Sequence, residues 1–131
     1  MSAGVLDTSV FIASESGRPL RRELLPDEGY VTVVTMAELE AGVLAAQSVD
    51  ARATRLRTVQ ALSNLELLDI DAAAAHEWAT LRYKLVVAGR RVNVNDLWIA
   101  AVAHARHLPV ITQDDDFDAI SAVGGPMVTR V

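Results

Sequence analysis

The sequence predicts an α/β fold: a three-layer α/β/α domain built on a short parallel sheet. Two observations predict it. Short apolar, β-branched segments alternate along the chain with longer segments of helical periodicity, an alternation typical of parallel sheets covered on both faces. The chain has 131 residues, the length of one domain with its own hydrophobic core. We therefore expect a single domain over residues 1–131.

The first predicted strand is short and buried. Val5 and Leu6 form it, and Asp7 follows at its carboxyl end. A short helix is expected to begin at residues 10–13 and to end at Gly17, a residue that favours helix C-termini. Residues 19–25 predict one or two further helical turns.

The middle of the chain continues the alternation. The β-branched run 30–34 predicts a second strand, and Thr35 is expected to cap a helix that continues to about Ala46. Asp50 is expected to cap a further helix, and residues 65–70 predict the third strand. The positions expected to face the core on these two helices have helical spacing: Leu39, Val43, Ala46, Leu56, Val59 and Leu62.

The last third of the chain predicts two helices and two strands. Helices are expected over 71–89 and 95–107, each capped by its first residue. The second is apolar on nearly every face and should be deeply buried. Residues 109–112 predict the fourth strand, an acidic segment 114–121 predicts a helical turn, and 127–131 predicts a last strand at the sheet edge.

Four carboxylates are expected to meet at one rim of this sheet. Asp7 ends the first strand, and Asp114 lies just past the fourth. Glu38 is expected in the first turn of the helix after the second strand, and Asp96 opens the helix that leads into the fourth. Because ligands of parallel sheets bind beyond the carboxyl ends of the strands, this rim is the predicted site.

Each of these acids also has an ordinary structural interpretation. Glu38 completes a capping box with Thr35, Asp96 suits the positive end of a helix, and Asp114 belongs to a solvated acidic run. Together, however, four like charges repel one another unless a cation compensates them. The chain has no cysteine and no cluster of histidines, so the oxygen ligands favour Mg²⁺ or Mn²⁺. Such an ion can activate water and neutralise charge on a phosphodiester.

Composition narrows the possible classes of protein. The formal net charge of −5 argues against a protein that coats DNA nonspecifically, but not against a nucleic-acid enzyme. The lack of cysteine excludes disulfides and favours a reducing compartment. No apolar run approaches the roughly 20 residues needed to span a bilayer, and the first residues lack a basic leader. We expect a cytoplasmic protein with no membrane association.

Four sequence blocks carry a resemblance to a known family. Gly4–Val10, Thr35–Gly42, Asn95–Ala101 and Val110–Phe117 resemble the four blocks of PIN-domain ribonucleases, in particular the VapC toxins of bacterial toxin–antitoxin operons. The blocks occur in the family's order and span the chain. The resemblance implies a PIN-like fold and an endoribonuclease that depends on Mg²⁺ or Mn²⁺.

The resemblance also implies roles for individual residues and for partners. Four positions match the family's catalytic and metal-binding carboxylates: Asp7, Glu38, Asp96 and Asp114. Asp116 matches an acid that assists through a second metal or water, and Thr112 matches a hydroxyl that supports the site. The implied partners are an RNA substrate, a VapB antitoxin that itself binds operator DNA, and a second copy of the chain.

Two interpretations from other classes remain open. One is a metal-dependent phosphatase or phosphoacceptor domain with Asp7 as nucleophile, which would favour a second acid two residues later or a lysine near the rim. Ser9 stands at that position, and Lys84, the only lysine, lies in a predicted helix. The other is a non-enzymatic module whose acidic rim binds an arginine-rich partner. Dependence on divalent metal separates an enzyme from such a module.

Basic residues and histidines are open to two roles each. Arg90 and Arg91 precede the rim helix and either bind RNA or are solvated. His104 and His107 have the spacing of a metal pair, although a helix C-terminus, which favours positive charge, explains them better. Three arginines after the first strand either bind RNA phosphates or form a solvated face: Arg18, Arg21 and Arg22.

Overall fold

Five parallel strands form the centre of the molecule. The computed structural model describes all residues, 1–131. The strands pair in the order β3-β2-β1-β4-β5, and every pair is parallel. Their bounds are β1 (Ala3–Leu6), β2 (Glu28–Thr32), β3 (Glu66–Leu68), β4 (Val110–Thr112) and β5 (Val128–Arg130). The first and fourth strands, more than 100 residues apart in sequence, are thus neighbours.

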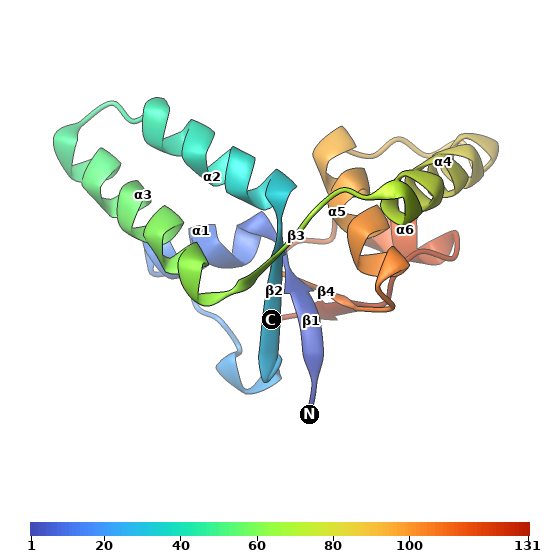
Figure 1. The fold of residues 1–131 in the computed structure, drawn as a ribbon, viewed down its shortest axis with the longest axis horizontal. Helices are drawn as coiled ribbons and strands as arrows, with labels where there is room; N and C mark the ends of the chain where they lie inside the picture. The colour runs from blue at the N-terminus through green and yellow to red at the C-terminus, as the bar shows by residue number, and fades with distance from the viewer.

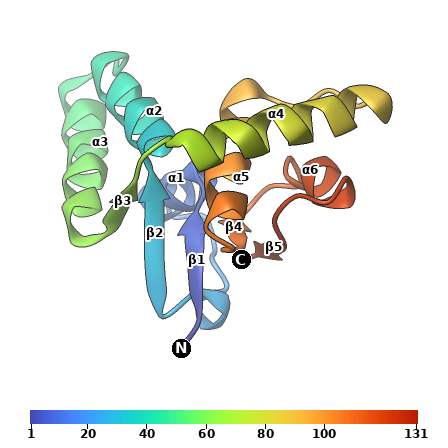
Figure 2. The same cartoon turned by 45° about the vertical axis from the view of Figure 1, so that its right-hand side comes forward.

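Helices cover both sides of the sheet, which confirms the three-layer prediction (Figure 1). The helices α4, α5 and α6 lie on one side, and α1 with the paired α2 and α3 lies on the other. Figure 2 shows α2 and α3 side by side. The bounds are α1 (Thr8–Ser16), α2 (Val33–Leu44), α3 (Val49–Ala61), α4 (Ala72–Val87), α5 (Val94–Ala105) and α6 (Asp118–Ala122). Two short 3₁₀ turns, Arg22–Leu24 and Leu62–Asn64, precede β2 and β3.

The alternation of strand side chains divides the core between the two sides. Val5 of β1 is paired in register with Val110 of β4, and both pack in the main cluster with α4, α5 and α6. The next pair, Leu6 and Ile111, packs on the other side with Val10 of α1. This follows because successive side chains of a strand point to opposite faces. The residue after Leu6, Asp7, then leaves the sheet at its carboxyl edge.

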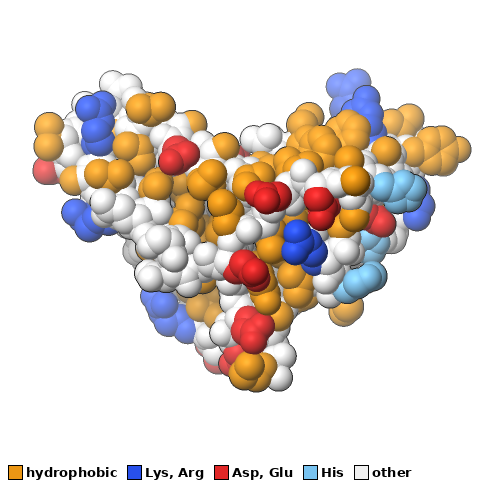
Figure 3. All heavy atoms as spheres, viewed as in Figure 1, with side chains coloured by type: hydrophobic (Ala, Val, Ile, Leu, Met, Phe, Trp, Pro, Cys, Tyr) orange, Lys and Arg blue, Asp and Glu red, His pale blue; other side chains and the backbone are white.

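The most buried helix is α5, as its composition predicts. Six of its residues are buried, and four of these are the consecutive small or β-branched residues 100–103. Small side chains let α5 lie close to both α4 and the sheet. No helix is long and apolar enough to cross a bilayer. Some hydrophobic side chains remain exposed near the end of α4, including Tyr83, Val86 and Val87, and hydrophobic side chains crowd that end of the molecule (Figure 3).

Four predicted helix starts are wrong by two or three residues. The helix expected from residues 10–13 begins at Thr8, with Asp7 as its N-cap. In the other three, an earlier residue takes the N-cap position: Thr32 in place of Thr35, Ser48 in place of Asp50, and Asn93 in place of Asn95. The Thr32 hydroxyl accepts the backbone N–H of Thr35 at 3.3 Å. Strand β2 therefore ends at residue 32, and Glu38 lies in the second turn of α2, not the first.

One predicted core position on α3 is also wrong. Leu56 is 44 % exposed, and α3 has no fully buried residue. The reason is that α3 lies beyond the sheet and packs mainly against α2 and, less extensively, α1. Val59 and Leu62, by contrast, contribute to the core on this side as predicted.

Candidate active site

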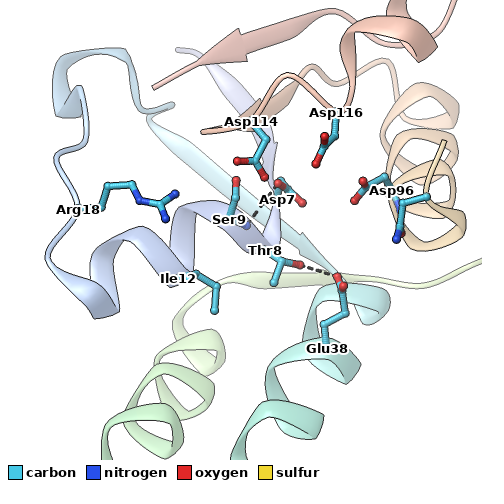
Figure 4. Close-up of a pocket in the computed structure, with 10 residues that line it drawn as sticks. Asp7, Thr8, Ser9, Ile12, Arg18, Glu38, Asp96, Asp114 and Asp116 are labelled. Carbon is cyan, nitrogen blue, oxygen red and sulfur yellow. Dashed lines mark hydrogen bonds between the residues drawn. The ribbon is translucent and has the colours of Figure 1, made fainter. Parts of the chain in front are cut away.

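A cavity of about 400 Å³ opens at the carboxyl edge of the sheet. Ten residues line it, and Ile12 is the only hydrophobic one. Half of them are the acids singled out in the sequence: Asp7, Glu38, Asp96, Asp114 and Asp116. Figure 4 shows their carboxylates pointing toward the same space from different elements. Topology therefore brings together residues that are spread over most of the chain.

Asp7 is the most buried of the acids, with 3 % of its surface exposed. It caps α1 by accepting the backbone N–H of Ser9 at 3.3 Å. The hydroxyl of Thr112 donates a second hydrogen bond to the same carboxylate oxygen at 3.0 Å. Burial raises the pKa of Asp7, because the anion loses hydration, and the hydrogen bonds from Ser9 and Thr112 oppose this rise. These bonds also fix the direction of the carboxylate.

A chain of hydroxyl groups links Asp7 to the segment that carries Asp114. The Thr112 hydroxyl has one proton and donates it to Asp7. Ser9 Oγ, 3.1 Å from Thr112 Oγ1, must therefore donate to it. Ser9 Oγ also accepts the N–H of Gln113 at 3.0 Å, and Thr112 Oγ1 accepts the N–H of Asp114 at 3.1 Å. The exit from β4 is thus bound to the start of α1.

Glu38 does not form the capping box expected from the sequence. Its carboxylate instead accepts a hydrogen bond from the hydroxyl of Thr8 at 2.7 Å. Thr8 Oγ1 also lies 2.9 Å from the hydroxyl oxygen of Thr35, which is fully buried. Because the Thr8 proton is donated to Glu38, Thr35 must donate to Thr8. Glu38 is therefore directed toward Asp7 by two hydroxyls from α1 and α2 (Figure 4).

Asp96 lies in the first turn of α5, as expected. Its pKa is raised from 3.8 to about 7. Burial is the main cause, and the negative charges of Asp7, Asp116, Glu38 and Asp114 follow in that order. Near neutral pH this carboxyl group is therefore partly protonated without a cation. The repulsion shows that the acids interact as one cluster.

The acidic run after β4 is divided by position. Asp114 and Asp116 line the cavity, whereas Asp115 between them is exposed and does not. Phe117 is buried and anchors the turn. Asp118 is largely exposed and pairs with Arg130 at 2.7 Å. The expectation that an extended segment with alternating side chains would divide these acids is wrong in its reason, because residues 113–117 form bends and a turn, and this turn directs Asp115 to solvent.

The donor set of the cavity fits a hard divalent cation. All the candidate ligands are carboxylate oxygens, the kind that Mg²⁺ and Mn²⁺ prefer. The raised pKa of Asp96 has the same implication, since a bound cation would offset both the burial of the charge, which is the main cause, and the repulsion from the neighbouring acids. No three of the carboxylates are arranged as ligands around a single point. The site is therefore an open group of acids and not a closed metal cage.

The basic residues near the rim occupy different environments. Only Arg18 lines the acidic cavity. Arg21 donates to the backbone carbonyl of Arg130 at 2.7 Å, and Arg22 is exposed on its 3₁₀ turn. Arg90 and Arg91 line a separate hollow at the end of α4. The histidines lie elsewhere: His104 is 3.6 Å from Glu77, and neither histidine lines the acidic cavity.

Four cavity residues were not predicted from the sequence: Thr8, Ser9, Ile12 and Asn93. Thr8 directly follows Asp7 in the sequence, and this adjacency is the signal that could have identified it. The features that a phosphoacceptor would require are not found in the cavity. Ser9 is engaged with Thr112 and Gln113, and the Lys84 ammonium lies near Gly124, outside the cavity.

Comparisons with known proteins agree with this geometry. The family model of the PIN domain matches residues 4–123. The chain is 57 % identical to Ribonuclease VapC5 of Mycobacterium tuberculosis over 130 residues, which cover 99 % of this chain and 96 % of that protein. It is 44 % identical to Ribonuclease VapC4 of the same organism, with 89 % and 90 % covered.

A solved structure supports the same assignment. The crystal structure of VapBC-5, a member of the VapBC family of toxin-antitoxin systems from Mycobacterium tuberculosis, contains a chain of the same fold. Its TM-score is 0.93 at 53 % sequence identity, with both chains fully covered. The fold, the acidic cavity and these relatives lead to one conclusion: the chain belongs to the PIN domain family and, within it, to the VapC ribonuclease toxins.

Proposed function

We propose that this VapC ribonuclease is an endoribonuclease that requires Mg²⁺ or Mn²⁺, bound by the acids of the cavity, and that a VapB-type antitoxin inhibits it. The observation that carries the proposal is the cluster of five carboxylates in one cavity, with the pKa of Asp96 raised to about 7 by burial and by its acidic neighbours. A site this acidic repels RNA unless cations neutralise it. A divalent ion is therefore part of the proposed substrate complex.

The proposed roles follow from how each acid is held. Asp7 and Glu38 are oriented by hydroxyl donors and are the proposed fixed ligands. Asp96 and Asp114 complete the proposed catalytic set, and Asp116, more exposed, assists from the rim. A divalent ion, when bound, supplies positive charge that stabilises the phosphodiester as it becomes more negative during hydrolysis.

No side chain in the cavity is proposed as a covalent nucleophile. Ser9 Oγ donates its proton to Thr112 and accepts a backbone N–H, so no base is placed to activate it. The hydroxyl of Thr8 is likewise committed to Glu38. Water is therefore the proposed nucleophile, and the protein's contribution is to position the acids and hence the substrate.

The antitoxin is proposed to bind over the same cavity. The crystal structures of VapBC-5 and of DNA-bound VapBC from Salmonella typhimurium, a match at TM-score 0.82 and 27 % identity, are of toxin–antitoxin systems. An arginine from a partner can bridge two carboxylates without metal. We further propose a homodimer, operator DNA contacts only through the antitoxin, a single PIN domain over residues 1–131, and a cytoplasmic location.

The test uses the full chain purified free of antitoxin. Total RNA is incubated with Mg²⁺, with Mn²⁺, and with EDTA, beside the variants Asp114→Asn and Asp115→Asn. Cleavage that requires metal, is lost in Asp114→Asn and persists in Asp115→Asn agrees with the proposal. Undiminished cleavage in EDTA contradicts metal dependence. No cleavage with either metal, together with partner binding that survives EDTA, would favour a binding module.

A further inference from the structure

Arg18 is the only cation that lines the acidic cavity. Its side chain forms no ion pair with any carboxylate, since the three ion pairs of the chain involve other residues. Nor does it donate a hydrogen bond to any protein atom, unlike Arg21 and Arg130. A guanidinium beside five carboxylates that pairs with none of them is available for a ligand from outside the chain.

The backbone at Arg18 is held firmly in this position. Gly17 ends α1 in the left-handed conformation, with φ of 74°, and the N–H of Arg18 donates back to a carbonyl of α1 at 2.9 Å. Pro19 follows and restricts Arg18 to an extended conformation. The Pro19 carbonyl accepts a hydrogen bond from the side chain of Gln113 at 3.1 Å. Since Gln113 immediately precedes Asp114, the arginine is tied to the loop that carries an acid of the site.

The direction of the side chain completes the argument. Figure 4 shows the Arg18 guanidinium pointing toward Ser9 and Asp114, on the side of the cavity opposite Asp96. An RNA strand that places one phosphate among the acids extends past the cavity in both directions. On the Arg18 side, the next phosphate meets a cation and not another carboxylate.

We propose that Arg18 binds a backbone phosphate of the RNA that flanks the phosphate being cleaved. This inference rests on the proposed ribonuclease function and adds a substrate-binding residue to it. A guanidinium matches phosphate geometry because it donates two parallel hydrogen bonds. At this position it also offsets the repulsion between the acidic rim and the RNA backbone. Arg21 and Arg22 do not share the role, since neither lines the cavity.

The experiment compares the full chain with Arg18→Gln, Arg18→Lys and the control Arg22→Gln. The substrate is a 5′-fluorescein RNA oligonucleotide that spans a site cut by the unmodified chain. Cleavage is followed with enzyme in excess, so that half-saturation reports RNA binding and the plateau rate reports cleavage. Each variant is measured at several KCl concentrations and fixed Mg²⁺.

We expect Arg18→Gln to raise the enzyme concentration needed for half-saturation about tenfold, equivalent to about 1.4 kcal/mol of binding free energy. The plateau rate should stay within about twofold of that of the unmodified chain. The logarithm of affinity should also depend less steeply on the logarithm of salt, by about 0.7, the value for one phosphate contact on single-stranded nucleic acid. Arg18→Lys should restore part of the affinity because it keeps the charge. Arg22→Gln should match the unmodified chain.

Two results would overturn the inference and leave the proposed function intact. One is an Arg18→Gln variant that binds like the unmodified chain at every salt concentration. The other is weaker binding with an unchanged salt slope and a lowered melting temperature, which would indicate a structural role. If the unmodified chain cleaves no RNA in Mg²⁺ or Mn²⁺, the proposed function itself fails, and the inference with it.

Discussion

Burial of Asp96 and repulsion from the neighbouring acids should make the metal-free protein less stable as pH rises, and Asp96→Asn should remove much of this effect. The pKa of Asp96 is about 7 in the folded chain, whereas 3.8 is the ordinary value expected after unfolding. Between these values the folded state binds more protons than the unfolded state. Stability therefore decreases from about pH 4 to about pH 7, and the whole penalty is present above the folded pKa.

The size of the effect follows from the difference in pKa. The folded value lies about three pKa units above 3.8, and one unit corresponds to about 1.4 kcal/mol, so the upper bound is about 4 kcal/mol. Asp96 is only partly buried, and solvent screening reduces the expected penalty to about 1–2 kcal/mol. At pH 8 Asp96→Asn should therefore be more stable than the unmodified chain by that amount. The two should agree within about 0.5 kcal/mol only near pH 4, close to the unfolded pKa, where the carboxyl group of Asp96 is still protonated in the folded state.

The assay is urea denaturation of the EDTA-treated chain between pH 4 and pH 8 at constant ionic strength. Tryptophan fluorescence reports unfolding, since Trp78 and Trp98 stack with ring centroids 4.9 Å apart between α4 and α5. Asp115→Asn is the control, because Asp115 is exposed and lies outside the cavity. Parallel stability curves for Asp96→Asn and the unmodified chain across this range would refute the proposed repulsion.

Three further predictions concern the acids and the group that holds one of them. Thr8→Val should lower RNA cleavage about tenfold or more with little change in stability, because Glu38 loses its hydroxyl donor; Thr8→Ser should retain most activity, and equal loss in both would contradict the assigned role. Raising Mg²⁺ at fixed ionic strength should weaken inhibition by the antitoxin, and an unchanged inhibition curve would mean that the two do not compete. Asn substitutions in the acidic run should reduce cleavage, measured at saturating Mn²⁺, most at Asp114, less at Asp116, and almost not at all at Asp115 and Asp118. An inactive Asp118→Asn variant would contradict the placement of this loop.

The sequence predicted the order of elements and the meeting of the acids, because both depend on topology. Asp7 and Asp114 follow neighbouring parallel strands, and the carboxyl ends of such strands share an edge. Helix starts were less predictable where capping residues follow one another. Thr32 caps α2 and Thr35 does not, because β2 pairs with β3 only as far as Thr32 and Leu68. That limit is set by a partner strand more than 30 residues later.

The contacts around the acids could not be predicted, because they depend on side-chain directions across distant elements. The bond from Thr8 to Glu38 joins residues 30 apart in sequence. The separation of Arg18 from Arg21 and Arg22 depends on the left-handed turn at Gly17. Leu56 was misplaced for a related reason, since its periodicity did not show that α3 extends beyond the sheet.

The position of β4 beside β1 has a consequence for how the toxin is made. Val5 pairs with Val110, so the central strand β1 gains its second neighbour only after the chain has been synthesised past residue 110. Asp114 and the Thr112 hydroxyl that holds Asp7 arrive with the same late strand. A translation product that stops before residue 112 lacks both, together with Asp116. The acid set is therefore complete only once the chain has been synthesised through Asp116, and the segment that carries β4 and the loop after it completes the cavity.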